Sequence, residues 1–142
     1  NTEGCVRNME LARKLGITVL SGTDTGNSPY TLHGECHMYE AEILTKYVGY
    51  TPMEAIVANT KKNAFTIGLE DQLGTVEPGK LADVLILDKD PLADITVLQN
   101  PSNIVSLIKD GAIIDTDAPE PDIDIGSFEW PGRHFTAQWL ER

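Results

Sequence analysis

The stretch that most constrains this chain runs from Ile17 to Gly26 and reads Ile-Thr-Val-Leu-Ser-Gly-Thr-Asp-Thr-Gly. Its first half, as far as Ser21, is β-branched and apolar, and this predicts a short buried strand. Glycines flank the turn that follows, and Asp24 lies between them at the C-terminal tip of the expected strand. In barrels and open α/β sheets, this edge carries the chemistry. The stretch therefore predicts an α/β fold with one candidate functional carboxylate.

The segment before the expected strand has the pattern of a helix. Between Cys5 and Leu15, apolar side chains recur at helical spacing, and charged side chains fill most of the other positions. Gly16 then stands where a glycine commonly ends a helix. A helix, a glycine turn and a strand buried on both faces make an α/β unit, and such a strand needs parallel neighbours. We expect those neighbouring strands to come from elsewhere.

Two further helical segments are expected after the glycine-flanked turn. The first spans residues 38–48. The second has a strong start signal, because Thr51 as N-cap, Pro52 at the first helical position and Glu54 at the third complete a capping box. Helical character continues over residues 63–67, with room for a kink before them.

After Gly68 the sequence pattern changes from helical spacing to turns and short apolar runs. The pair Asp110-Gly111 between two apolar runs is a strong hairpin signal, and residues 91–94 have the pattern of a single helical turn. Strands are expected at residues 82–87, 104–108 and 112–114. Residues 69–115 are therefore predicted to form a small β unit with a boundary near Gly68.

The C-terminal part divides into two pieces. Residues 116–127 are acidic, contain prolines and carry no basic side chain, which is typical of an extended, solvated linker. The last piece is too apolar for a free tail, and we expect it to dock on a surface or a partner, with a short helix near residues 136–141. Its large apolar side chains are Phe128, Trp130, Phe135, Trp139 and Leu140. The predicted organisation is therefore 1–68, 69–115 and 116–142.

Composition limits the possible partners and location. The formal net charge is -11, and an acidic chain repels nucleic acid and anionic membranes. No apolar run is long enough to span a bilayer. Cys5 and Cys36 form no metal-binding or disulfide pattern, which favours two unpaired thiols in a reducing, cytoplasmic compartment. The abrupt opening on Asn1, without an initiator Met, favours a fragment or a processed piece.

The succession of motifs resembles the amidohydrolase superfamily, nearest to its imidazolonepropionase-like and Xaa-Pro-dipeptidase-like hydrolases. The similarity covers about residues 5–115. Its specificity lies in the order of the segments rather than in any single motif. The matching segments are 16–19 with 22–24, then 51–56, Thr60, 63–64 and 68–69, and finally 74–88, 90–91 and 105–111.

The resemblance implies the C-terminal part of a (β/α)8 barrel, comprising its last helix, strand and helix, followed by strands of a small β-sandwich. It implies a divalent metal at the barrel mouth, zinc first among the candidates, with one or two ions. Asp24 is the residue that matches the family's strand-eight aspartate, which binds the metal and accepts a proton from the water. The implied reaction is hydrolysis of a C–N bond in a small amide, peptide or cyclic amide by metal-activated water.

The sequence departs from the family in one large respect. The other ligands of the family are a His-x-His pair on the first strand, a lysine or glutamate on strand four and histidines on strands five and six, and none has a counterpart here. A zinc site needs three or four ligands. The remaining ligands would therefore come from the rest of the barrel or from another subunit, in a protein that we expect to be a homo-oligomer.

The run His33-Gly34-Glu35-Cys36-His37 leaves two interpretations open. As part of the loop after strand eight it would overhang the site, and His33 is then the candidate for substrate contact. Alternatively, His33, Cys36 and His37 could form a small metal site of their own. Other titratable side chains are expected on the solvated surface or in packing, namely Glu40, Glu42, Lys61, Lys62 and His134.

Two functions of different classes remain. The first is the metal-dependent hydrolase, with Asp24 as metal ligand and catalytic base. The second is an incomplete fragment or an interaction module that keeps the family's framework and has neither metal nor activity on its own.

Overall fold

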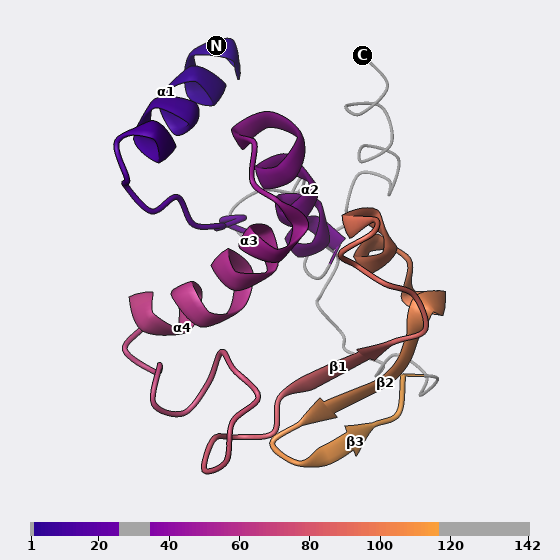
Figure 1. Ribbon diagram of the computed structural model, residues 1–142. Coiled ribbons are helices and arrows are strands. Elements are labelled where there is room, and N and C mark those ends of the chain that lie inside the picture. Colours follow the sequence, from indigo (N-terminus) through magenta and orange to yellow (C-terminus); the bar gives the residue numbers. More distant parts are fainter. Residues whose placement is uncertain (1, 26–34, 117–142) are drawn as a thin grey trace, which may run out of the picture.

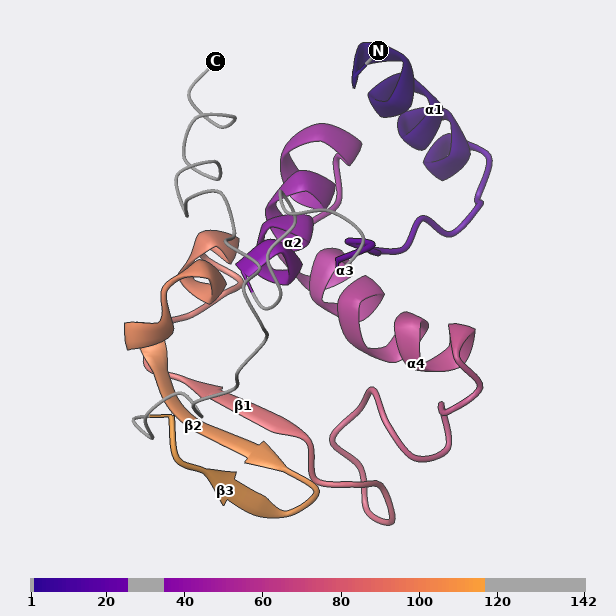
Figure 2. The ribbon, with the colours of Figure 1, turned by 180° about the vertical axis from the view of Figure 1, so that it is seen from behind.

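The computed structural model describes residues 2–25 and 35–116 (Figure 1). His33, His134 and the C-terminal segment from residue 117 lie outside the described residues. Both views place α1 and the sheet at opposite ends of the molecule, with the other helices between them (Figure 2). The elements are α1 Thr2–Lys14, α2 Glu35–Val48, α3 Pro52–Val57, the π-helical turn η1 Ala58–Lys62, α4 Asn63–Thr66, β1 Val84–Leu87, the 3-10 turns η2 Ile95–Gln99 and η3 Pro101–Asn103, β2 Ile104–Lys109 and β3 Ala112–Ile114.

Helix α1 ends at the predicted glycine. Gly16 has a φ of 75°, its amide donates to the carbonyl oxygen of Arg13 at 3.0 Å, and the amide of Ile17 donates to that of Ala12 at 2.9 Å. This pair of bonds is a Schellman cap, in which a left-handed residue satisfies the last carbonyl groups of a helix. The cap turns the chain sharply into the segment that leads to Asp24.

The segment from Ile17 to Thr23 is extended, but it belongs to no sheet in the described part of the chain. The predicted strand is not formed among the described residues, and the prediction that its parallel neighbours come from elsewhere stays a prediction. Ile17 is 58% exposed, and the side chains of Tyr50 and Asn63, rather than a neighbouring strand, bond to the backbone. A parallel strand needs partners of the same direction on either side, and the described residues provide none.

The second helical region begins as the sequence predicts. Thr51 Oγ1 accepts a hydrogen bond from the amide of Glu54 at 3.2 Å, and Glu54 Oε2 accepts from the amide of Thr51 at 2.7 Å. These bonds, the backbone amide first and the Thr51 hydroxyl next, hold the pKa of Glu54 below its ordinary value, with Arg13 adding to the effect. The expected irregularity is the π-helical turn η1, which lies between α3 and α4. The first of the two helices starts earlier than predicted, at Glu35.

The core of the described part lies between α2, α3 and the 3-10 turn η2. It brings Ile95 of the C-terminal half against Leu44 and Val48 of α2, so the two halves share one apolar cluster. The other buried members are Ala41, Tyr50, Ala55 and Ala58. The β unit is therefore anchored to the helices through η2.

The sheet is antiparallel, in the order β1-β2-β3. The predicted hairpin is confirmed: Asp110 and Gly111 have φ values of 50° and 79°, as a type I′ turn requires, and Ile108 pairs with Ile113. Residues 91–93 form a turn rather than a helix, and the helical segment begins at Ile95. β1 starts two residues later than predicted, at Val84.

The loop between α4 and β1 is fixed by Lys80. Its ammonium group donates to the carbonyl oxygens of Glu70 at 2.7 Å and Leu73 at 3.4 Å, and to Thr75 Oγ1 at 2.6 Å. Gly74, in the same loop, has a φ of 89°, and a Cβ there would come within 2.8 Å of the Ala64 Cβ. The loop therefore packs its backbone directly against the helical region that follows Asp24.

Two predictions about charged side chains on α2 are wrong. Glu42 is not on the solvated surface: its side chain is 19% exposed, and Oε2 accepts a hydrogen bond from Gln99 Nε2 at 2.7 Å. Glu40 is also half-buried, and its Oε2 accepts a hydrogen bond from the Gly22 amide. Lys61 is exposed as predicted and Lys62 is half-exposed.

In the described part of the chain, no helix is both long and apolar enough to cross a bilayer.

Candidate active site

Asp24 lies at the end of the extended segment, on an exposed turn. Its φ is 50°, in the left-handed region that Asp tolerates better than most residues do. The neighbouring hydroxyl groups of Thr23 and Thr25 approach each other at 3.3 Å across the turn. The structure thus presents the carboxylate at the tip of the segment, where the sequence predicts it.

Three side chains hold the backbone that leads to Asp24, one from the connection between α2 and α3, one from α4 and one from α2. The Tyr50 hydroxyl donates to the carbonyl oxygen of Val19 at 3.0 Å and accepts from its amide at 3.1 Å. Asn63 Nδ2 donates to the Ser21 hydroxyl at 3.0 Å and lies 3.4 Å from its carbonyl oxygen. These bonds replace the ladder that a neighbouring strand would provide.

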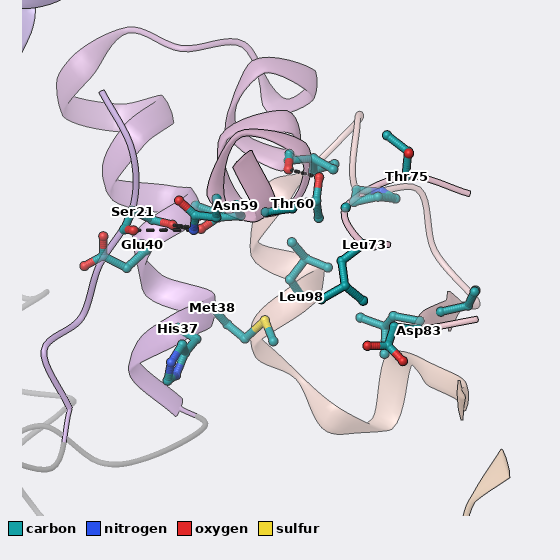
Figure 3. A pocket seen from close by; sticks show the side chains of 18 of the residues that line it. Ser21, His37, Met38, Glu40, Asn59, Thr60, Leu73, Thr75, Asp83 and Leu98 are labelled. Carbon is teal, nitrogen blue, oxygen red and sulfur yellow. Dashed lines mark hydrogen bonds between the residues drawn. The ribbon is translucent and has the colours of Figure 1, made fainter. Parts of the chain in front are cut away.

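A third contact comes from α2. Glu40 Oε2 accepts a hydrogen bond from the amide of Gly22 at 3.3 Å. This contact explains why Glu40 is half-buried rather than solvated, and it fixes the residue two positions before Asp24. Figure 3 shows Glu40 beside Ser21 and Asn59, at the edge of a cavity.

The Ser21 hydroxyl has a second partner, Asn59 in η1. Asn59 Nδ2 donates to the carbonyl oxygen of Ala55 at 3.0 Å, so its Oδ1 is the atom that faces Ser21 and accepts from the hydroxyl. Ser21 therefore donates to Asn59 and accepts from Asn63, and the direction of each bond is fixed. Dashed lines mark bonds of this cluster in Figure 3.

A cavity of about 950 Å³ lies next to this cluster. Ser21, Gly22 and Thr23 form one edge of it, together with His37 and Glu40, whereas Asp24 is not among its lining residues. Most of the wall is apolar and comes from both halves of the chain, including Met38, Ile56, Leu73, Val84, Leu85, Leu87 and Leu98 (Figure 3). Reactions on polar bonds need convergent polar groups. We therefore place the candidate site at the polar edge and the Asp24 turn rather than in the apolar interior.

The described residues do not make a metal site by themselves. Among them, no three or more His, Cys, Asp and Glu side chains come together in a way that could hold an ion. Asp24 is exposed and has the oxygen donor that divalent ions accept, so it fits the role of one ligand among several.

The alternative small metal site depends on a residue outside the described part. Cys36 is half-buried and His37 is exposed in the first turn of α2, and His33 precedes the described helix. Both cysteines are free thiols, as the sequence predicts. The contact between His33 and a substrate remains a prediction for the same reason.

Sequence reasoning did not identify Tyr50, Glu40 and Asn59 as residues that organise the site. One signal could have pointed to the asparagines. Asn59 and Asn63 stand four residues apart in a helical region directly after the expected strand, which places two amide side chains on one face. The tyrosine and glutamate carry no such signal, because their roles arise from distant parts of the chain.

Comparison with known proteins places these features in a family. The sequence profile described as "Amidohydrolase family" matches residues 5–114. Ochratoxinase from Aspergillus niger is 35% identical over 104 residues, which cover 72% of this chain and 20% of that protein. Imidazolonepropionase from Symbiobacterium thermophilum is 31% identical over 122 residues, covering 80% of this chain and 27% of the relative.

Comparison with solved structures agrees with the match of the sequence to this family. A Xaa-Pro dipeptidase solved with methionine bound in its active site superimposes with a TM-score of 0.67 at 32% sequence identity. The match covers 78% of this chain and 25% of that structure. The chain thus spans between 20% and 27% of the length of these relatives. From residue 5 to residue 114, helices and sheet included, this chain belongs to the amidohydrolase family.

Proposed function

We propose that this chain is the C-terminal portion of a metal-dependent amidohydrolase that hydrolyses a C–N bond in a small amide, peptide or cyclic amide. The observation that carries the proposal is the exposed Asp24 carboxylate at the tip of a segment whose backbone is held at Val19, Ser21 and Gly22. A carboxylate on a rigid support is what proton transfer at a fixed position requires. The family membership of the chain gives that carboxylate its context.

The names of the relatives support the class of reaction and leave the substrate open. One solved relative is a Xaa-Pro dipeptidase, so a peptide is its substrate. The other two relatives are named ochratoxinase and imidazolonepropionase, and neither of these names describes a peptide. A shared framework with differing substrates supports a proposal at the level of the bond that is cleaved.

In the proposed reaction, Asp24 would contribute one ligand oxygen to a divalent ion, zinc first among the candidates, which when bound would supply Lewis acidity and lower the pKa of the attacking water. Asp24 would then accept the proton from this water. The water oxygen bonds to the carbonyl carbon, and the proton held by Asp24 passes to the leaving nitrogen as the C–N bond breaks. The products are a carboxylic acid and an amine, and Asp24 returns to its ionised state.

The remaining ligands are proposed to lie outside this chain, in the rest of a (β/α)8 barrel or in another subunit. Two features support this. The extended segment from Ile17 would become the eighth barrel strand once parallel neighbours are present. Many large apolar side chains of the described part are also exposed, which is typical of surfaces that another segment covers; they include Leu15, Ile17, Phe65, Ile67, Val105 and Ile113.

The test uses the complete protein that contains this chain. Metal content and hydrolysis of a panel of Xaa-Pro dipeptides, N-acyl amino acids and cyclic amides are measured for the wild type and for Asp24→Asn. We expect stoichiometric divalent metal in the wild type and a loss of about 10²–10⁴ in kcat for the variant, as removal of a general acid–base produces. Asp71→Asn, which makes the same charge change on an exposed loop residue, should retain full activity.

Two results would contradict the proposal. If the complete protein holds no metal and hydrolyses none of the panel, the chain is a non-catalytic module. If these 142 residues alone bind metal tightly and turn over substrate, the remaining ligands do not lie elsewhere.

A further inference from the structure

The cluster of Ser21, Asn59 and Asn63 is unusual among the contacts of the extended segment. It is the point at which two side chains from one helical region converge on a single hydroxyl group, three residues before Asp24. All three side chains are half-buried. Partly desolvated hydrogen bonds of this kind are stronger than exposed ones and cost more to break.

The cluster has one arrangement of donors and acceptors. Asn59 turns its amide nitrogen toward the carbonyl oxygen of Ala55, and the atom that faces the Ser21 hydroxyl is its oxygen, which can only accept. The Ser21 hydroxyl must therefore donate to Asn59, and its lone pair accepts from Asn63 Nδ2. The bonds run in one direction, from Asn63 through Ser21 and Asn59 to Ala55. A series of directed hydrogen bonds fixes the rotamers of these three side chains as well as the distances between them.

The cluster also controls the backbone close to Asp24. Asn63 Nδ2 lies 3.4 Å from the carbonyl oxygen of Ser21, and the next peptide group is held through the Gly22 amide by Glu40. Asn59 belongs to the π-helical turn η1, and Asn63 opens α4 directly after it. Single π-helical turns inside α-helices are frequent at functional sites, because they redirect side chains.

We propose that Ser21, Asn59 and Asn63 form a positioning unit that sets the Asp24 carboxylate for metal binding and proton transfer. This inference rests on the proposed function of Asp24. Groups that orient a ligand from the second layer of a metal site typically change metal affinity or activity by about 10–100-fold when they are removed. We expect Ser21→Ala in the complete protein to lower kcat by about that factor, with a small change in KM.

Metal affinity provides a readout that is independent of turnover. The dissociation constant for zinc, measured by competition with a chromophoric chelator, should rise by about 10–100-fold in Ser21→Ala. Ser21→Thr keeps the hydroxyl group and should restore most of the affinity and of kcat. Thr45→Val removes a hydroxyl that donates to the Glu42 carbonyl within α2, and should change neither.

The direction of the bonds gives a sharper comparison. Asn63→Asp replaces the amide that donates to Ser21 by an acceptor, and so removes the first hydrogen bond of the series. Asn59→Asp makes the same change of charge and shape and removes the bond to the Ala55 carbonyl, but it keeps the oxygen that accepts from Ser21. We therefore expect Asn63→Asp to have the larger effect on metal affinity and kcat, by at least about tenfold.

The outcomes separate this inference from the proposed function. If Asp24→Asn abolishes activity while Ser21→Ala leaves both zinc affinity and kcat unchanged, the positioning unit is overturned and the proposed function stands. Equal losses in Asn63→Asp and Asn59→Asp would also overturn it, since the direction of the bonds would then not matter. If the wild-type protein binds no zinc and has no activity, the proposed function is overturned, and the positioning role that rests on it is overturned as well.

Discussion

The Tyr50 hydroxyl bonds to both backbone groups of Val19, donating to the carbonyl oxygen at 3.0 Å and accepting from the amide at 3.1 Å. One side chain thus satisfies the donor and the acceptor that a neighbouring strand would otherwise pair. Tyr50 is 8% exposed, and Arg13 stacks over its ring at 5.1 Å. The extended segment before Asp24 is thus held in place by side chains, with no sheet around it in the described part of the chain.

Tyr50→Phe should destabilise the protein by about 1–3 kcal/mol. The substitution keeps the packing and leaves the amide and the carbonyl of Val19 without this partner, and an unsatisfied buried polar group costs this much. Thermal and urea unfolding of the complete protein provide the measurement. Tyr47→Phe, the same change at a side chain that is 40% exposed, should be close to neutral. Equal effects of the two substitutions would argue against the role assigned to Tyr50.

Gly74→Ala should cost about 2–4 kcal/mol. The added Cβ would lie 2.8 Å from the Ala64 Cβ and 2.9 Å from the Lys61 Cα, and the φ of 89° adds backbone strain. Gly79 separates these two causes. It has a φ of 90° with nothing near its Cβ position, so Gly79→Ala should cost only about 1 kcal/mol. Denaturant unfolding measures the free energy of unfolding of both variants. If the loop around Gly74 can move away from Ala64 without cost, the two variants should be equally stable.

Lys80→Met should destabilise the protein by about 1.5–3 kcal/mol. The side chain is 15% exposed and donates to two carbonyl oxygens and the Thr75 hydroxyl, and hydrogen bonds from a charged donor contribute this much. Methionine keeps the length of the side chain and none of the donors. Lys89→Met, at an exposed position beyond β1, serves as the control for loss of charge. Hydrogen exchange should show faster exchange in the loop of Lys80→Met, and an unchanged loop would contradict the prediction.

Stability should depend on pH through Asp83. The Asp83 carboxylate accepts a hydrogen bond from Lys109 Nζ at 2.5 Å and another from the Asp110 amide at 2.8 Å. These contacts, with Lys109 the larger cause, lower the pKa of Asp83 below its ordinary value of 3.8. A lowered pKa in the folded state stabilises the protein above the unfolded value, and the contribution disappears as the pH falls through the folded value.

Asp83→Asn should therefore lower the melting temperature at pH 7, and the difference from the wild type should shrink below about pH 4. Melting curves between pH 2 and pH 7 give the comparison. Asp71→Asn changes the net charge equally on an exposed loop residue, so it controls for general charge effects. A difference that persists unchanged at pH 2 would show that the hairpin contacts act independently of ionisation.

Local sequence rules predicted the elements whose determinants lie close together in the chain. The capping box at Thr51 and Glu54, the glycine cap at Gly16 and the Asp110-Gly111 hairpin are each specified within a few residues, and each is confirmed. These features depend on backbone dihedral angles and adjacent hydrogen bonds, which neighbouring residues control.

Features that depend on distant residues were missed. Glu40 and Glu42 read as surface charges, yet each accepts a hydrogen bond from a remote segment, Gly22 and Gln99 respectively. The strand expected from Ile17 has the right composition but lacks paired neighbours in the described part of the chain. A strand is defined by its partners, and no local pattern can provide them.

The sequence by itself determined the family, the turn that carries Asp24 and the helices that follow it, because order along the chain and local dihedral preferences suffice for these. Only the tertiary structure decided how that turn is held. Tyr50, Asn59, Asn63 and Glu40 reach the segment across 18 to 42 positions of sequence. Hydrogen bonds over such separations exist only after the core between α2, α3 and η2 has brought these elements together.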